Sequence, residues 1–237
     1  MKGVPILLTP RVRTVIQARM ASSRLPGKVL ANLAGRPLLE FVVRRLRAAG
    51  KDWEMTVATT TSAADDAIEA CCRRLEVPCF RGPEADVLGR YVAAGADLAD
   101  SDILLRATAD NPLYCSGRTA AIVAEHRRWN SDYTCIERLS YVVPEVMRVG
   151  ALRSMAVRAT DAYCREHVTP YFREAPHDFH VVQLPADWNG LRPDIRLTVD
   201  TAEELSRMGM ICQPLAREDV LFPLEDAYSL VAFSCRP

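Results

Sequence analysis

Three cationic side chains gather in a stretch of ten residues near the N-terminus: Arg19, Arg24 and Lys28. Two serines and a Pro-Gly pair lie between them, and no acidic residue interrupts the stretch. Arginine presents a planar fork of donors that matches phosphate oxygens, and lysine adds a compact charge. A glycine lets the backbone approach a ligand closely. The chemistry best suited to this stretch is polyphosphate binding, and an ordinary solvated basic loop is the alternative.

The pattern around this stretch places it between a strand and a helix. An apolar run at 12–17 precedes it, and apolar residues at helical spacing follow Gly35-Arg36-Pro37 as far as about Gly50. The backbone N–H groups at a helix start would add affinity for anions. The stretch contains neither the Walker motif G-x-x-x-x-G-K-[ST] nor the dinucleotide motif G-x-G-x-x-G.

Strand and helix patterns alternate through the first half of the chain. Strands are expected at 12–17, 55–59, 77–80 and 103–107, and helices at about 38–50, 62–75 and 87–98. Ser62-x-x-Asp65 resembles a capping box that would open the second helix. This alternation predicts an α/β fold with a mostly parallel sheet, whose ligands collect beyond the carboxyl ends of the strands.

The pattern is less regular beyond residue 130. Segments 133–136, 141–143, 146–149 and 181–184 are expected as strands of a smaller mixed sheet, and this half is expected to handle a second substrate. Segment 195–199 returns to the main core, and a capping box at Thr201-Ala202-Glu203-Glu204 opens a helix to about 211. Two prolines mark residues 1–11 as an extension, and the tail from Cys212 is ambiguous.

Two aspartates follow apolar segments and could hold a metal ion. Asp110 ends the buried run 103–107, and Asp200 ends the run 195–199. Mg²⁺ prefers octahedral oxygen coordination by one or two carboxylates together with phosphates and water, so this pair would suit it. The alternatives are a turn residue in Asp110-Asn111-Pro112 and, for Asp200, a charge favoured at a helix N-terminus.

Several motifs carry a resemblance to a known family over roughly residues 12–211. The first loop resembles the signature of sugar cytidylyltransferases, and is closest to the spore-coat polysaccharide family, which is similar to the 3-deoxy-manno-octulosonate cytidylyltransferases. The matching runs are Ile16-Gln17-Ala18-Arg19-Met20-x-Ser22-x-Arg24-Leu25-Pro26-Gly27-Lys28, Arg81-Gly82 with Asp86-Val87-Leu88-x-Arg90-Tyr91, Arg106-x-Thr108-x-Asp110-x-Pro112-Leu113, Asp200, and Glu166-His167-Val168-Thr169-Pro170-Tyr171. Ala109 stands where the family usually has glycine.

This resemblance implies a Rossmann-like, GT-A-type nucleotidyltransferase fold in a single domain. Residues 12–130 would bind the nucleotide, 131–195 the acceptor and a second protomer, and 196–211 would return to the core with the second metal ligand. It further implies CTP, Mg²⁺, a small acidic acceptor such as a sugar acid or phosphonate, and a homodimer. Pyrophosphate would be released.

The resemblance also assigns roles to residues. Catalysis would use Arg19, Lys28 and Asp110, and the metal would be held by Asp110 and Asp200. The nucleotide would be bound by Gln17, Ala18, Arg19, Ser22, Arg24, Lys28, Thr59, Thr60, Arg81, Gly82, Asp86, Val87 and Arg106. The acceptor would be bound by Glu145, Glu166, His167 and Tyr171. Taken without the resemblance, the segment from Arg81 is equally an ordinary capped helix, and His167 is a structural hydrogen-bonding residue.

One segment departs from the family pattern. Where the family commonly has Pro-x-Gly-x-Asp-x-Glu-Val, this chain has Tyr141-Val142-Val143-Pro144-Glu145-Val146, which keeps the glutamate alone among the polar positions. The identity of the acceptor therefore stays open. Two other functions also stay open: a glycosyltransferase that uses a nucleotide-sugar, and a catalytically silent nucleotide-binding protein.

The composition limits the partners and the location. Lys and Arg number 30, as do Asp and Glu, so the formal net charge is zero and nothing global favours nucleic acid. Eight cysteines without a C-x-x-C pair, and the lack of a secretion signal, favour free thiols in a reducing cytoplasm. No run of about 18 apolar residues is present, so no membrane span is expected.

Overall fold

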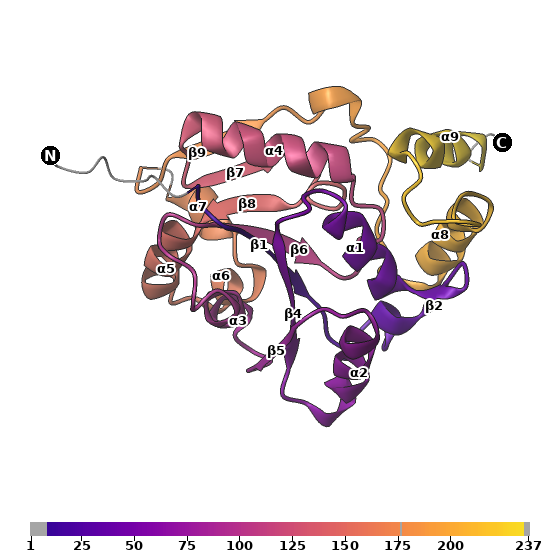
Figure 1. Ribbon diagram of the computed structural model, residues 1–237, viewed down its shortest axis with the longest axis horizontal. Coiled ribbons are helices and arrows are strands. Elements are labelled where there is room, and N and C mark those ends of the chain that lie inside the picture. The colour runs from indigo at the N-terminus through magenta and orange to yellow at the C-terminus, as the bar shows by residue number, and fades with distance from the viewer. Residues whose placement is uncertain (1–8, 176, 235–237) are drawn as a thin grey trace, which may run out of the picture.

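The computed structural model describes residues 9–175 and 177–234, so most of the expected N-terminal extension and Cys235 lie outside the described residues. Its centre is a seven-stranded sheet with the order β5-β4-β1-β6-β8-β7-β9 (Figure 1). In chain order the strands are β1 Val12–Gln17, β4 Glu54–Thr60, β5 Cys79–Gly82, β6 Ile103–Thr108, β7 Tyr133–Ile136, β8 Glu145–Arg148 and β9 Val181–Leu184.

The first four of these strands run parallel, as the alternating pattern predicted. β8 is antiparallel to both β6 and β7, and β7 is parallel to β9. The later strands therefore extend the main sheet and do not build a separate one. The reason is direct pairing of β6 with β8, in which Leu104 lies opposite Met147. A second, two-stranded antiparallel sheet joins β2 (Asn32–Leu33) to β3 (Arg36–Pro37).

Most expected elements are present, with ends that move by a few residues. The strands at 12–17, 133–136 and 181–184 match β1, β7 and β9. Segment 141–143 is a turn rather than a strand, and its Val142 is buried. Segment 195–199 forms no strand, although Leu197 and Val199 are buried. A segment can thus enter the core without a partner strand, which an apolar pattern alone does not reveal.

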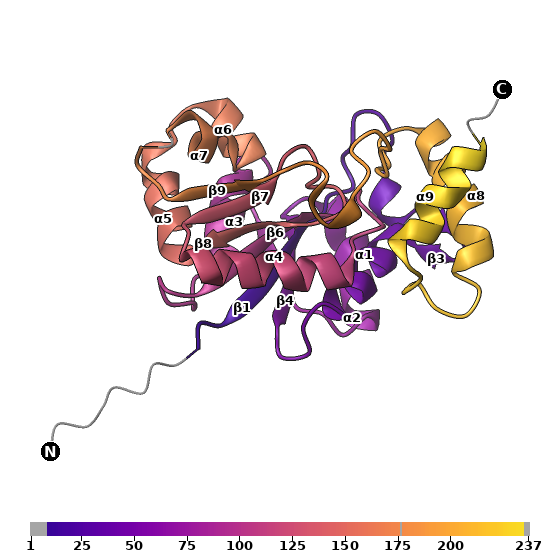
Figure 2. The same cartoon turned by 90° about the horizontal axis from the view of Figure 1, so that it is seen from above.

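Helices cover both faces of the sheet. On one face lie α1 (Leu38–Arg47), α2 (Asp66–Arg74) and α4 (Ser116–Trp129), and on the other α3 (Val87–Ala94), α5 (Val149–Arg158), α6 (Ala162–His167) and α7 (Pro170–Glu174) (Figure 2). α8 (Ala202–Leu215) and α9 (Leu224–Ser234) pack together beside β2, away from α5 and α6. None of the helices within 9–175 and 177–234 is long and apolar enough to cross a membrane.

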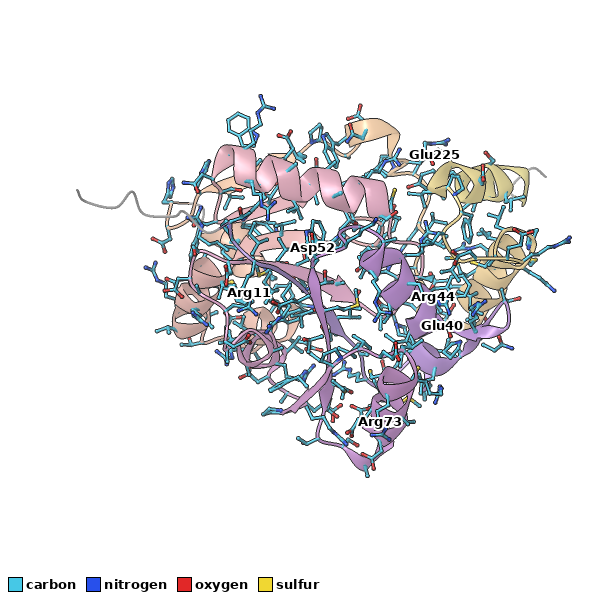
Figure 3. The ribbon with its side chains drawn as sticks, viewed as in Figure 1. Arg11, Glu40, Arg44, Asp52, Arg73 and Glu225 are labelled. Atoms are coloured by element: carbon cyan, nitrogen blue, oxygen red, sulfur yellow. The ribbon has the colours of Figure 1, made fainter. Side chains whose placement is uncertain are left out.

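Alternation along β1 explains how one strand serves both faces. Ile16 packs into the core beside α1, and Val15 packs into the core beside α3, and both are fully buried. The outer side of α1 is polar: Glu40 forms ion pairs with Arg36 (2.8 Å) and Arg44 (2.9 Å), and Figure 3 shows Glu40 and Arg44 together on this helix. α1 is thus an amphipathic helix with a polar outer side.

Two smaller expectations are confirmed. The capping box of α8 is complete, because Thr201 Oγ1 accepts from the Glu204 N–H (3.2 Å) and Glu204 Oε2 accepts from the Thr201 N–H (3.1 Å). All seven cysteines in the described part of the chain are free thiols. The ambiguous tail continues α8 to Leu215 and then forms α9.

Candidate active site

Two chambers adjoin at the carboxyl ends of β1 and β6. The first has a volume of about 370 Å³ and the second about 450 Å³. The first is lined by Gln17, Ala18, Arg19, Ser22, Ser23, Arg24, Lys28, Val29, Arg106, Thr108, Ala109, Asp110, Glu166, His167 and Asp200. Arg106, Thr108, Asp110 and Asp200 line both. The two aspartates therefore stand at the boundary between the chambers.

Lys28 joins the two aspartates. Its Nζ donates to Asp110 Oδ2 (2.9 Å), to Asp200 Oδ1 (2.8 Å) and to the carbonyl oxygen of Val199 (3.0 Å). Asp200 also pairs with Arg24 (2.9 Å) and Arg196 (3.2 Å). Burial opposes the ionisation of Asp200, but the hydrogen bond from Lys28 and the three nearby positive charges outweigh it, so the pKa of this carboxyl is lowered. The Asp200 carboxylate is thereby kept charged at neutral pH.

Backbone contacts bring these distant residues together. Gly27 has φ of 75°, a conformation that suits glycine, and it starts the short 3-10 helix Lys28–Leu30. The Val199 N–H donates to the Asp110 carbonyl oxygen at 2.9 Å, which fixes the segment before Asp200 against the loop after β6. Ala109 lies outside the left-handed region and its N–H donates to Gln17 (2.9 Å), so alanine replaces the family's glycine without backbone strain.

Asp65 anchors the first loop, a role that the sequence did not suggest. Its Oδ1 accepts from the Met20 N–H (2.8 Å), and its Oδ2 accepts from the hydroxyls of Thr59 (2.9 Å) and Thr60 (2.5 Å). The expected capping box is therefore wrong, because Asp65 points at Met20 and not back at Ser62, and the Ser62 hydroxyl accepts from the Ala64 N–H (3.4 Å) and not from that of Asp65. Thr59 and Thr60 are buried and line neither chamber. The sequence feature that could have indicated this role of Asp65 is a carboxylate that closely follows a run of threonines.

The segment from Arg81 is also outside the two chambers. Arg81 pairs with Asp66 (2.6 Å) and Glu69 (3.0 Å), and Gly82 is buried at the end of β5. Asp86 caps α3 by accepting from the Gly89 N–H (2.8 Å) and pairs with Arg165. Val87 is buried in the core. In this structure these four residues support the helix and the sheet edge.

Arg106, which lines both chambers, forms an ion pair with the buried Glu145. Arg106 Nη1 donates to Glu145 Oε2 (2.7 Å), and Glu145 Oε1 accepts from Thr169 (3.0 Å) and from Tyr133. Burial opposes the charge of Arg106, and the Glu145 carboxylate outweighs it and raises the pKa of Arg106. Burial and the same carboxylate raise the pKa of Tyr133. Glu145 lines neither chamber, and its oxygens are occupied by protein groups.

The segment from Glu166 contributes unevenly to the site. Glu166 and His167 line the first chamber, whereas Tyr171 packs edge-on against Phe179 outside both chambers. Arg19 lies 3.8 Å from the Glu166 carboxylate. Val168 has φ of 69° and ψ of −60°, and the Thr169 N–H donates to the His167 carbonyl oxygen (2.9 Å). This is a strained γ-turn for a β-branched residue, and such strain concentrates at functional sites.

The second chamber has lining residues that no motif indicated. They include Arg138, Ser140, Tyr141 and Arg196. The Tyr141 hydroxyl donates to the Ile195 carbonyl oxygen (2.9 Å). This hydrogen bond joins segment 141–146, where the family pattern is lost, to segment 195–199. Arg138 has φ of 59° and a largely exposed side chain. The sequence marked this region only as the place where the family pattern is lost.

The aspartate pair fits a divalent cation. Within 9–175 and 177–234, no group of three or more His, Cys, Asp or Glu side chains converges as a metal site. One oxygen of each aspartate nevertheless converges on a single cationic atom, Lys28 Nζ, at 2.8 and 2.9 Å. Two carboxylates suffice for Mg²⁺ when phosphate oxygens and water complete the octahedron. Asp110 and Asp200 therefore suit a hard cation that arrives with a polyphosphate.

Comparisons with known proteins show the family and the fold of this chain. A family model described as "Cytidylyltransferase" matches residues 14–219. The spore coat polysaccharide biosynthesis protein SpsF of Bacillus subtilis is 34% identical over 205 residues, which cover 84% of this chain and 85% of that protein. A solved cytidylyltransferase from Leptospira borgpetersenii superposes with a TM-score of 0.85 at 25% identity, covering 95% of each chain.

A more distant structure shares the fold alone. CMP:2-keto-3-deoxy-manno-octonic acid synthetase in complex with CTP superposes with a TM-score of 0.65 at 16% identity and covers 86% of this chain and all of that one. Together these structures confirm the expected nucleotidyltransferase fold.

Proposed function

This chain belongs to the cytidylyltransferase family, and from that premise we propose that it transfers CMP from CTP to a small acidic acceptor, with Mg²⁺, and releases pyrophosphate. The observation that carries the proposal is the convergence of Lys28, Asp110 and Asp200 between two chambers. A chamber on each side of a candidate metal site gives room for two substrates.

The first chamber would hold the triphosphate. Arg19, Arg24 and Lys28 supply its positive charge, and Ser22 adds a hydroxyl donor. CTP as the nucleotide is supported by the family and by the CTP complex of the structural neighbour. In the proposed reaction an acceptor oxygen attacks the α-phosphorus in line, the bond to the bridging β-phosphate oxygen breaks, and the cations neutralise the charge on the departing pyrophosphate.

The metal would be held by Asp110 and Asp200. When bound, Mg²⁺ neutralises charge on the phosphate oxygens and orients them for in-line displacement. The chain's own part is to fix both carboxylates in position, through Lys28, Arg24 and the contact between Val199 and Asp110. A neighbouring fold has been solved with manganese, which supports a divalent cation.

The second chamber would receive the acceptor. Arg138 and Arg196 lie at its wall, while the carboxylates that line it, Asp110 and Asp200, are the ones assigned to the metal. Once those carboxylates are neutralised, the chamber has an excess of positive charge, which favours a carboxylate or phosphonate on the acceptor. Glu166 and His167, which the resemblance assigns to the acceptor, line the first chamber and not the second. A homodimer and a cytoplasmic location are further parts of the proposal, and the family resemblance supports them.

Pyrophosphate release tests the proposal against its alternatives. The protein is incubated with Mg²⁺, each of the four ribonucleoside triphosphates, and a panel of sugar acids and phosphonates. We expect acceptor-dependent pyrophosphate with CTP. A glycosyltransferase would instead consume a nucleotide-sugar and release no pyrophosphate, and a silent binding protein would bind CTP without turnover. Either result would overturn the proposed activity.

A further inference from the structure

We propose that Lys28 occupies the metal position in the nucleotide-free protein, so that the divalent cation enters only together with the triphosphate that draws the ammonium away. This inference rests on the proposed metal pair, Asp110 and Asp200. It goes beyond that pair because it gives Lys28 two positions: one between the carboxylates before the nucleotide binds, and one on the phosphates afterwards.

The first support is the complete pairing of the ammonium. An ammonium has three N–H donors. Lys28 Nζ directs them to Asp110 Oδ2, Asp200 Oδ1 and the Val199 carbonyl oxygen, at 2.9, 2.8 and 3.0 Å. The residue is 9% exposed, so water does not supply these contacts. Lys28 therefore sits at a charge-balanced site between the aspartates and does not extend freely into the first chamber.

The second support is that every oxygen of the two carboxylates already has a partner. Asp110 Oδ1 accepts from the Thr108 hydroxyl at 2.7 Å. Asp200 Oδ1 is shared by Lys28 and Arg24, and Asp200 Oδ2 pairs with Arg196 at 3.2 Å. A divalent ion held by the two aspartates would have to compete with Lys28 and these other partners for the carboxylate oxygens. It would also lie against an ammonium of the same sign, which costs energy in a partly buried site.

The third support is the place to which Lys28 can go. Lys28 and Arg24 both line the first chamber, where the triphosphate is proposed to bind. A lysine side chain is long and flexible, and its charge can follow a phosphate group. The incoming phosphates would repay the contacts that Lys28 loses, and would supply oxygen ligands for the metal at the same moment. Metal and nucleotide binding are thus coupled through one side chain.

Direct Mn²⁺ binding, measured by electron paramagnetic resonance without nucleotide or acceptor, tests this inference. We compare the wild type with Lys28→Met, which keeps the length of the side chain and removes its charge. We expect Lys28→Met to bind Mn²⁺ about tenfold or more tightly than the wild type. Lys28→Arg, which keeps the charge, is expected to stay near the wild type.

A double variant and a stability measurement make the result decisive. Adding Asp110→Asn to Lys28→Met should remove the gain in Mn²⁺ affinity, because the gain comes from the freed carboxylate. Mn²⁺ should also raise the melting temperature of Lys28→Met more than that of the wild type, which shows that the variant is folded and binds the ion. Equal or weaker Mn²⁺ binding by Lys28→Met, or a gain that persists in the double variant, overturns the inference.

This test stands apart from the test of the proposed function. It contains no CTP and no acceptor, so a failure to release pyrophosphate leaves its outcome unchanged. Conversely, the wild type could transfer CMP while Lys28→Met shows no gain in Mn²⁺ affinity. That result would leave the proposed function standing and overturn the two positions proposed for Lys28.

Discussion

Two clusters of charged side chains lie side by side in this protein and use the same chemistry differently. In one, Lys28 bridges Asp110 and Asp200 at the boundary of two chambers. In the other, Arg106, which lines both chambers, pairs with Glu145, which lines neither. Both contain short ion pairs between segments far apart in the sequence. The side chain of Asp110 is 28% exposed, whereas that of Glu145 is 5% exposed.

The difference lies in what the carboxylates can exchange. Asp110 and Asp200 accept from long cations that also face a chamber, so a metal and phosphates could replace those partners. Glu145 accepts from the buried Tyr133 and Thr169 as well as from Arg106, and although Arg106 lines both chambers, Glu145 lines neither. An ion pair can exchange its partners for a ligand when both the carboxylate and the cation face a chamber. It supports the fold when the carboxylate is enclosed by protein groups.

The largest expected effect concerns the buried pair. Glu145→Ala leaves Arg106 without its counter-charge in the interior, and losing one partner of a buried ion pair typically costs about 3–5 kcal/mol of stability. We expect urea denaturation to show a loss of this size, while the folded fraction keeps its affinity for CTP. Glu137→Ala, at an exposed neighbouring position, is the control and should change little. A stable Glu145→Ala without turnover would instead make Glu145 part of the active site.

For the aspartates at the chambers we expect the opposite result: turnover falls while stability is kept. Asp110→Asn keeps the shape of the side chain but removes the charge, and losing one such contact typically lowers kcat about 100- to 1,000-fold. Melting temperature should stay near that of the wild type. Asp194→Asn, which alters an exposed ion pair with Arg192, is the matched control with near-normal turnover. Near-normal turnover in Asp110→Asn would contradict the assignment of this residue.

A buried histidine shows how pH acts on a group that burial keeps neutral. His126 is buried, its Nδ1 forms hydrogen bonds with the hydroxyls of Ser131 and Thr134, and burial lowers its pKa from 6.5 to about 4. Below about pH 6.5, His126 therefore binds a proton in the unfolded chain but stays neutral in the folded protein until the pH approaches 4. Stability should fall as the pH drops from about 6.5 towards 4, by about 3 kcal/mol at most.

The difference between variants isolates this contribution. Denaturation of His126→Asn across this pH range should show a flatter loss than the wild type, because other groups still titrate in both proteins. His177→Asn, at an exposed position, should keep the slope of the wild type. Identical slopes for His126→Asn and the wild type would show that His126 does not control the acid response.

The smallest expected effect sharpens the roles of the two chambers. Arg138→Gln and Arg196→Gln remove positive charge from the second chamber, so the KM for an acidic acceptor should rise about tenfold in each. The affinity for CTP should stay unchanged in Arg138→Gln, because Arg138 does not line the first chamber, whereas Arg196 also pairs with Asp200. Calorimetry with CTP and steady-state kinetics with the acceptor separate the two effects. A loss of CTP affinity without a change in acceptor KM would reverse the assignment of the chambers.

The sequence predicted the parallel half of the sheet because each strand there is an apolar run that ends at a turn signal. It also predicted that the first loop, the Thr59 loop, the Arg81-Gly82 loop and Asp110 would share one edge, since carboxyl ends of parallel strands meet there. Only the first loop and Asp110 of these line the chambers, and Asp200 joins them although the segment before it forms no strand. It could not predict that Glu145 would be saturated by Tyr133 and Thr169, because that depends on β8 pairing antiparallel to β6. Nor could it locate Arg138 or Arg196, which reach the second chamber from segments without strand structure.

The fate of each phosphate of CTP tests the central claim most directly. The protein is incubated with Mg²⁺, the panel of acidic acceptors, and CTP labelled with ³²P at either the α or the γ position. We predict that the α label appears in the acceptor product, that the γ label appears in pyrophosphate, and that Asp110→Asn forms neither. Transfer of the γ label to an acceptor, or no labelled product with any acceptor while CTP stays bound, would contradict the account.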